Sequence, residues 1–186
     1  MENGIECNDR VGRFCVSGVE VLRVRITLPC RAELSDFYRG VAQRVWAYCE
    51  GTLRLRAEEA YEASEEPNKR FAFPTFLYRL EGRICHEEAG LLSVRLEGSL
   101  GRRGMREPEV RWADAHTWLT EGGKTYLLPP EQAVARFGGG TLSRRERKRC
   151  RGAILSEGRV FLCDGKDFRI FTPKISKTKQ SAQKNE

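Results

Sequence analysis

The chain has 186 residues, of which 40% are hydrophobic and 32% are charged. This composition excludes a wholly disordered chain, and no apolar run is long enough to cross a bilayer, so one soluble globular domain is expected. The net charge of +7 is unevenly placed: residues 143–186 hold 13 Lys and Arg against 5 Asp and Glu, which leaves the rest of the chain at −1. The first residues carry no export signal, which predicts a cytoplasmic protein without membrane contact.

The first predicted element is a strand in residues 19–29, where apolar and polar side chains alternate until Pro29 ends the ladder. Apolar side chains then recur at helical spacing through residues 31–50, which predicts one long helix. Gly51 interrupts this pattern, and the helical spacing resumes after it. The second stretch is either a continuation of the helix or a separate one.

Alternation with a period of two returns in residues 76–81 and 92–97, which predicts two antiparallel strands. A further strand is expected in residues 110–119, followed by a Glu-Gly-Gly-Lys turn and a short strand in residues 125–128. Two consecutive prolines then open a short helix.

Three consecutive glycines end that helix, and Ser143 with Glu146 has the pattern of a capping box for a helix over residues 144–151. A last hairpin is predicted in residues 159–171, with an Asp-Gly turn between its strands. The lysine-rich residues 173–186 cannot bury apolar surface. We expect them to form a disordered basic tail.

Together these elements predict a single α+β domain over residues 11–172. In this fold an antiparallel β-sheet packs against one long N-terminal helix, with short C-terminal helices and a final hairpin. The core is expected within residues 11–137, with the closing hairpin packed on it.

Several segments follow one another in an order that is found in a known family. They are the strand ending in proline at residues 19–29, the long helix, the Tyr-x-Leu strand at residues 76–80, its mate GLLSVRLEGSL at residues 90–100, and residues 112–134 with their Gly-Lys turn. This order resembles the RsiV-like domain of unknown function. That domain forms the extracellular part of certain bacterial anti-sigma factors, where it is a protein-binding module that recognises lysozyme. The resemblance implies an interaction module without enzyme activity.

The chain departs from this family at residues 101–106, which read Gly-Arg-Arg-Gly-Met-Arg where the family has a Gly-Gly-Ala-His stretch. His116 does not map onto the family's histidine, and the sequence contains neither an anti-sigma region nor a transmembrane helix. Lysozyme recognition is therefore not carried over. The resemblance implies a protein partner of unknown identity.

Four side chains at alternate positions of one predicted strand share one of its faces: Trp112, Asp114, His116 and Trp118. Two aromatic walls around a carboxylate and an imidazole suit a small-ligand site. The alternative is an ordinary polar pair flanked by core tryptophans. No catalytic centre is predicted, because His86 and its neighbour Cys85 would point to opposite faces of a strand.

No metal and no cofactor are expected. The seven cysteines are scattered, odd in number and without a Cys-x-x-Cys pair, and only two histidines are present. This usage predicts reduced thiols and no structural zinc site. Neither of the glycine-rich motifs that bind dinucleotides or nucleoside triphosphates occurs.

Six cations are concentrated in one short segment: Arg144, Arg145, Arg147, Lys148, Arg149 and Arg151. A helix with this surface would pair with phosphates or with an acidic partner, although it has no interleaved aromatic side chains to stack on bases. A solvated helix is the other interpretation. The sequence thus predicts a non-enzymatic, sensor-like protein- or ligand-interaction module. Nucleic-acid or acidic-partner binding through residues 144–151 is the alternative.

Overall fold

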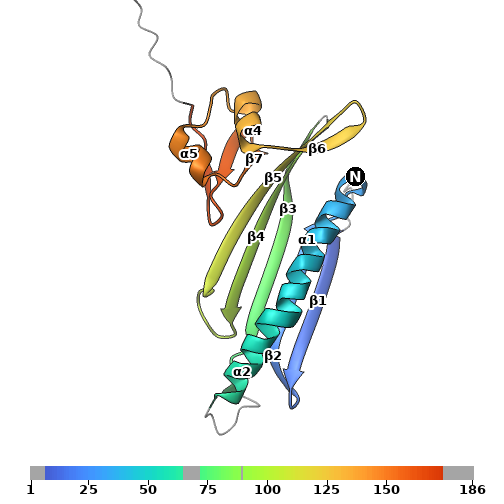
Figure 1. Ribbon diagram of the computed structural model, residues 1–186, viewed down its shortest axis with the longest axis vertical. Helices are drawn as coiled ribbons and strands as arrows, with labels where there is room; N and C mark the ends of the chain where they lie inside the picture. The colour runs from blue at the N-terminus through green and yellow to red at the C-terminus, as the bar shows by residue number, and fades with distance from the viewer. Residues whose placement is uncertain (1–6, 65–71, 89, 174–186) are drawn as a thin grey trace, which may run out of the picture.

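A six-stranded sheet, covered on one face by a long helix, forms the larger part of the molecule (Figure 1). The computed structural model describes residues 7–64, 72–88 and 90–173. Residues 174–186, which make up nearly all of the predicted basic tail, lie outside the described residues. In the described part of the chain, no helix is both long and apolar enough to cross a membrane.

The strands of the large sheet lie side by side in chain order. They are β1 (Cys7–Val16), β2 (Val19–Pro29), β3 (Phe76–Glu88), β4 (Leu91–Arg102), β5 (Val110–Glu121) and β6 (Lys124–Leu128). All neighbouring strands are antiparallel except β2 and β3, which pair in parallel. The prediction of a purely antiparallel sheet is wrong at this pairing, because the intervening helix returns the chain to the end of the sheet where β2 began.

The helix between β2 and β3 runs along one face of the sheet (Figure 1). It consists of a 3-10 turn, η1 (Ala32–Leu34), then α1 (Ser35–Tyr48), a π-helical segment, η2 (Cys49–Leu53), and α2 (Arg54–Glu62). The π-helical segment accommodates Gly51 without ending the helix, so the two predicted helical stretches are continuous. The predicted long helix is therefore present, and it follows two strands, of which only β2 was predicted.

The main core lies between this helix and the facing side of the large sheet. Val24 and Ile26 of β2, Leu80 of β3 and Tyr38 of α1 are fully buried there. Intervening positions such as Arg25 point to the opposite face and are exposed. This one-sided burial explains why the alternating pattern predicted β2 and β3 correctly.

A second sheet packs against one end of the large sheet (Figure 1). It contains β7 (Gly152–Ser156), β8 (Arg159–Cys163) and β9 (Phe168–Ile170), and it is accompanied by α4 (Pro130–Phe137) and α5 (Arg144–Arg149). The predicted final hairpin corresponds to β8 and β9. Strand β7 adds a third member that the sequence pattern did not indicate, so the hairpin is part of a three-stranded sheet.

Close backbone contacts hold the small sheet against β5. A Cβ atom on Gly152 would lie 2.1 Å from the carbonyl oxygen of Ala115, so this approach requires glycine. Nearby, the N–H of Ala113 donates to the carbonyl oxygen of Gly165 at 3.0 Å. These contacts bring the segment after α5 to the outer edge of β5, beside the predicted ligand face.

Candidate functional site

The predicted ligand face of β5 lies under the long helix. His116 and Trp118 are buried against Phe37 and Tyr38 of α1. The ring of Phe37 meets the rings of His116 and Trp118 edge-on, with centroids 5.1 and 4.8 Å apart. These four rings form one aromatic cluster between the helix and the sheet.

Polar atoms in this cluster form a continuous chain of contacts. The indole Nε1–H of Trp118 donates to the Tyr38 hydroxyl at 3.2 Å, and that hydroxyl lies 3.3 Å from Nδ1 of His116. The other ring nitrogen of His116, Nε2, lies 3.5 Å from Oδ2 of Asp114. The chain therefore runs from a buried indole to a carboxylate that is 40% exposed.

The chemistry of the indole fixes the direction of the first of these hydrogen bonds. An indole N–H can only donate, so the Tyr38 hydroxyl accepts from Trp118. The hydroxyl can donate to Nδ1 of His116 when that nitrogen carries no hydrogen, and in that tautomer the imidazole hydrogen is on Nε2, which faces Asp114. Burial also raises the pKa of Tyr38 well above its usual value, so the phenol keeps its hydrogen.

This arrangement bears on the catalytic use of His116. In a catalytic dyad the imidazole contacts the carboxylate through one nitrogen and presents the other to a substrate. Here the second nitrogen faces buried Tyr38 instead of an open cavity. The geometry therefore supports a role for His116 in orienting Asp114, not in transferring a proton to a bound molecule.

Asp114 lies at the outer edge of β5, beyond the stretch that β6 covers. Its Oδ1 accepts the N–H of Ala115 at 2.8 Å. Burial alone would raise the pKa of Asp114, but the hydrogen bond and charge of His116, with help from the Ala115 N–H and the charge of Arg151, hold it below the usual value. The carboxylate is therefore ionised at neutral pH.

The four predicted ligand-face residues line three separate pockets. Trp118 borders a pocket at the start of the long helix, whereas Asp114 and His116 border another at the outer edge of β5. Trp112 lies over Gly98, where a Cβ atom would come within 2.1 Å of the indole, and it borders a third pocket. The structure thus keeps Asp114 and His116 together but does not place them between two aromatic walls.

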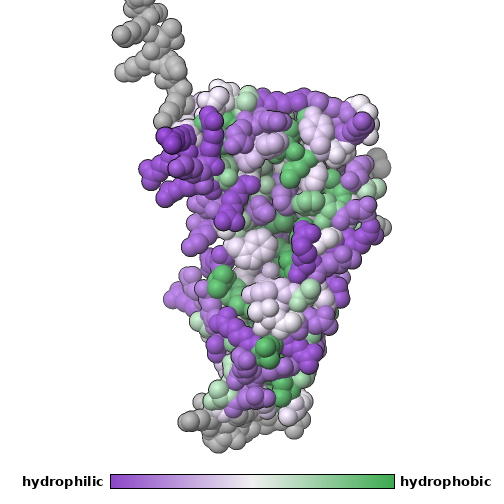
Figure 2. All heavy atoms as spheres, viewed as in Figure 1, coloured by the Kyte–Doolittle hydropathy of each residue, from purple (hydrophilic) through white to green (hydrophobic). Residues whose placement is uncertain are grey.

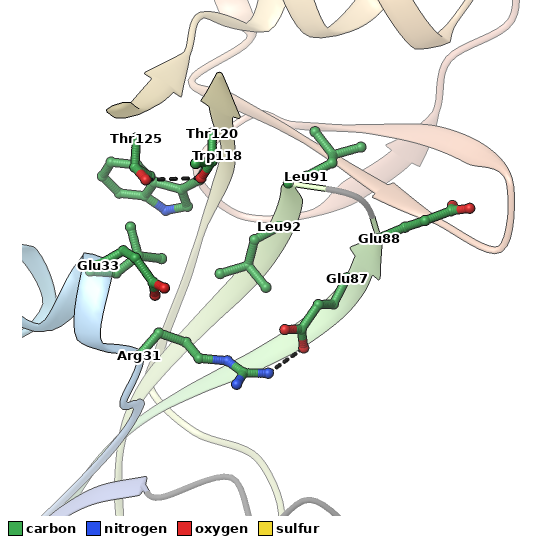
Figure 3. Close-up of a pocket in the computed structure, with 11 residues that line it drawn as sticks. Arg31, Glu33, Glu87, Glu88, Leu91, Leu92, Trp118, Thr120 and Thr125 are labelled. Carbon is green, nitrogen blue, oxygen red and sulfur yellow. Dashed lines mark hydrogen bonds and ion pairs between the residues drawn. The ribbon is translucent and has the colours of Figure 1, made fainter. Parts of the chain in front are cut away.

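The Trp118 pocket has a volume of about 240 Å³ (Figure 3). Trp118 and Leu92 supply its apolar wall, and Arg31 reaches across it to form an ion pair with Glu87. Glu33 points its carboxylate into the same space (Figure 3). Because Glu87 already engages the guanidinium, this pocket presents an indole and an acidic rim but no open pair of opposite charges.

The basic helix α5 begins with the predicted capping box. The N–H of Glu146 donates to the Ser143 hydroxyl at 3.3 Å, and the N–H of Ser143 donates to the Glu146 carboxylate at 2.8 Å. This confirms the predicted start of the helix. The helix ends at Arg149, so Arg151 of the predicted cluster lies beyond it and instead lines the pocket beside Asp114.

Four cations of α5 form what we call the basic helix surface: Arg144, Arg145, Lys148 and Arg149. All four are exposed, and no carboxylate within the described ranges forms an ion pair with any of them. The fifth, Arg147, donates through Nε to the carbonyl oxygen of Leu142 at 3.1 Å. Figure 2 shows strongly hydrophilic side chains gathered over α5.

The described residues contain neither a cluster of metal ligands nor an activated thiol. No group of three or more His, Cys, Asp or Glu side chains there is arranged to hold a metal ion. Six cysteines of the same part are free: Cys15, Cys30, Cys49, Cys85, Cys150 and Cys163. Burial raises the pKa of Cys49 to about 12 and that of Cys163 to about 11, so neither thiol is activated as a nucleophile.

Two residues that complete the site were not identified from the sequence. Tyr38 and Phe37 belong to the helical spacing that predicted the long helix, and no further role was predicted for them. Tyr38 is 78 positions from His116, and no local pattern joins them. A buried tyrosine beside polar groups on the facing strand becomes visible only when the helix is placed on the sheet.

Comparison with known proteins yields no family assignment. No family model and no curated protein matches the chain. Among solved structures, the chain is similar to a DUF3298 family protein from Pseudomonas aeruginosa PAO1, at 14% sequence identity and a TM-score of 0.43, covering 87% of this chain and 83% of that one. The resemblance to the RsiV-like domain stays a prediction.

Proposed function

We propose that this α+β protein is a non-enzymatic interaction module that binds an acidic segment of a protein partner through the basic helix surface. The observation that carries the proposal is the set of four exposed cations on α5, none of which forms an ion pair with a carboxylate of the described residues. Exposed positive charge of this density attracts acidic chains and accelerates their association.

Arginines elsewhere on the surface are largely neutralised, which sets α5 apart. On the exposed face of the large sheet, Arg79 and Arg83 both contact Glu81, and Arg95 contacts Glu97. Between β4 and β5, the carboxylate of Glu109 accepts hydrogen bonds from Arg56 and Arg102. The net positive charge of the molecule is therefore available mainly at the C-terminal sheet.

Several features favour a protein partner over nucleic acid. Helix α5 has only six residues and carries no aromatic side chain on which a base could stack. The RsiV-like resemblance points in the same direction, because that domain is a protein-binding module. The engaged nitrogens of His116 and the protonated buried thiols support a role without catalysis. Free cysteines also fit the cytoplasmic location that we propose.

The proposal is tested by fluorescence anisotropy with labelled decaglutamate as the acidic probe and a short DNA duplex as the competing probe. The triple variant Arg144→Gln/Arg145→Gln/Lys148→Gln is expected to weaken decaglutamate binding about tenfold. Raising the salt concentration from about 50 mM to about 300 mM should weaken wild-type binding as well.

A matched control changes the same amount of charge elsewhere, at three exposed arginines: Arg44, Arg106 and Arg111. This control variant is expected to bind decaglutamate nearly as well as the wild type. Equal losses in both variants would assign binding to net charge and overturn the proposal. Tighter binding of the duplex than of decaglutamate at equal salt would assign the surface to nucleic acid instead.

A further inference from the structure

A pocket of about 200 Å³ lies where the segment after α5 meets the outer edge of β5. Asp114, His116 and Arg151 line this pocket. Apolar groups from the end of β6 and the start of α4 complete it: Leu127, Leu128, Pro129 and Pro130. The pocket therefore combines a carboxylate, a guanidinium and an apolar wall.

The two opposite charges share this pocket without meeting. Arg151 is close enough to help lower the pKa of Asp114, yet these two described residues do not form an ion pair with each other. Elsewhere on this surface, neighbouring arginines and carboxylates do close into ion pairs, as Arg136 and Glu121 do at 2.7 Å. An open pair of opposite charges is the arrangement that a ligand with both charges can bridge.

Neighbouring groups of β5 fix the orientation of the Asp114 carboxylate. Its Oδ1 accepts the Ala115 N–H at 2.8 Å, and its Oδ2 lies 3.5 Å from Nε2 of His116, whose ring is fixed in turn by Tyr38. A carboxylate has about four acceptor positions, so two such contacts leave capacity for a ligand donor. Its orientation is thus preorganised before any ligand arrives.

Arg151 is also positioned by the fold. Its backbone N–H donates to the carbonyl oxygen of Cys163 at 2.8 Å. Its side chain passes over Gly165, where an added Cβ atom would lie 3.1 Å from Arg151 Cδ and 3.2 Å from its Nε. The next residue, Gly152, is pressed against Ala115 of β5. These contacts hold Arg151 at the position where it lines the pocket beside Asp114.

We propose that this pocket binds a small zwitterionic ligand of the α-amino acid class. The ligand ammonium pairs with Asp114, its carboxylate pairs with Arg151, and its aliphatic side chain packs against the proline and leucine wall. The pocket volume of about 200 Å³ leaves room for a small amino acid. This site is separate from the basic helix surface, so neither proposal depends on the other.

The test is a titration of isotope-labelled protein with L-valine, followed by the NMR signal of the Trp118 indole N–H. That group starts the hydrogen-bonded chain to Asp114, so a ligand on the carboxylate is expected to shift its resonance. The indole of Trp46, which stacks under Arg10, lies outside the chain and serves as an internal control. Two single-charge probes, N-acetyl-L-valine and L-valinamide, are each expected to bind about tenfold more weakly or worse.

Single substitutions test whether L-valine binds at Asp114 and Arg151 or elsewhere on the protein. Asp114→Asn and Arg151→Gln are each expected to abolish the L-valine-induced shift, whereas Arg159→Gln, at an exposed position of β8 outside both proposed sites, should behave like the wild type. The unliganded spectrum of each variant shows whether it is folded. The proposal is overturned if no shift occurs up to the solubility limit of L-valine, if either single-charge probe binds as tightly as L-valine, or if folded Asp114→Asn binds normally.

Discussion

At the scale of single residues, the Tyr38 hydroxyl joins the long helix to the sheet. Its oxygen accepts from the indole N–H of Trp118 at 3.2 Å and lies 3.3 Å from Nδ1 of His116. Both neighbours are buried, so neither can exchange this partner for water. The hydroxyl therefore contributes through the groups that it satisfies as much as through its own burial.

The variant Tyr38→Phe keeps the ring and removes this hydroxyl. We expect a loss of about 1–3 kcal/mol in the free energy of unfolding, because the Trp118 N–H and Nδ1 of His116 are left buried without a partner. Urea denaturation measures the change. The matched control is Tyr48→Phe, since Tyr48 is 47% exposed on the same helix. Equal effects of the two variants would contradict the role given to the Tyr38 hydroxyl.

Asp114 makes stability depend on pH in a defined direction. Its pKa in the folded protein lies below the ordinary value of 3.8, so the ionised carboxylate stabilises the fold above that pH. This contribution is lost as the pH falls through the folded-state pKa. We expect the wild type to exceed Asp114→Asn in unfolding free energy at about pH 7 and about pH 5, and the difference to shrink near pH 3. Urea denaturation at the three values tests this; a difference that grows toward low pH would contradict it.

At the scale of elements, sequence patterns identified those whose burial is one-sided. Strands β2 and β3 alternate because one face meets the core. In β5 the period of two still placed Trp112, Asp114, His116 and Trp118 on one face, although the small sheet buries Ala113, Ala115 and Thr117 on the other face. The sequence pattern did not predict β1, because it is an edge strand with exposed side chains and a bulge at Phe14 and Cys15. It did not predict the short β7 either, because β7 begins with three consecutive buried residues and therefore does not alternate. The parallel pairing of β2 with β3 depends on the path of the helix, which no local pattern encodes.

Replacement of glycine by alanine is expected to have opposite effects on stability at two positions. At Gly152, an added Cβ would lie 2.1 Å from the backbone of β5, so Gly152→Ala is expected to destabilise the fold by about 1–3 kcal/mol. At Gly51, in the π-helical segment, a Cβ meets nothing within 4 Å, so Gly51→Ala is expected to stabilise the helix by up to about 1 kcal/mol. Thermal and urea denaturation measure both. A tolerated Gly152→Ala would show that β5 and β7 do not need this close approach.

At the scale of the whole molecule, the small sheet is fastened to the large one by buried hydroxyl groups. Ser93 of β4 accepts the N–H of Leu155 at 3.0 Å and contacts the Thr117 hydroxyl at 3.1 Å. Thr117 of β5 donates to the carbonyl oxygen of Ala153 at 2.7 Å. Both side chains are buried, so these bonds form in a site without competing water. The candidate amino-acid pocket lies at the same junction and depends on its integrity.

We expect Ser93→Ala to weaken this junction more than it weakens either sheet. The Leu155 N–H loses its partner and the Thr117 hydroxyl loses a contact, which should lower the unfolding free energy by about 1–3 kcal/mol. In hydrogen exchange, the amides of β7 and β8 should lose protection by a larger factor than those of β3 and β4, because the small sheet would open locally. Ser99→Ala is the matched control, as Ser99 lies on the same face of β4 beyond the junction. Uniform loss of protection across both sheets would instead mean that the molecule opens as one cooperative unit.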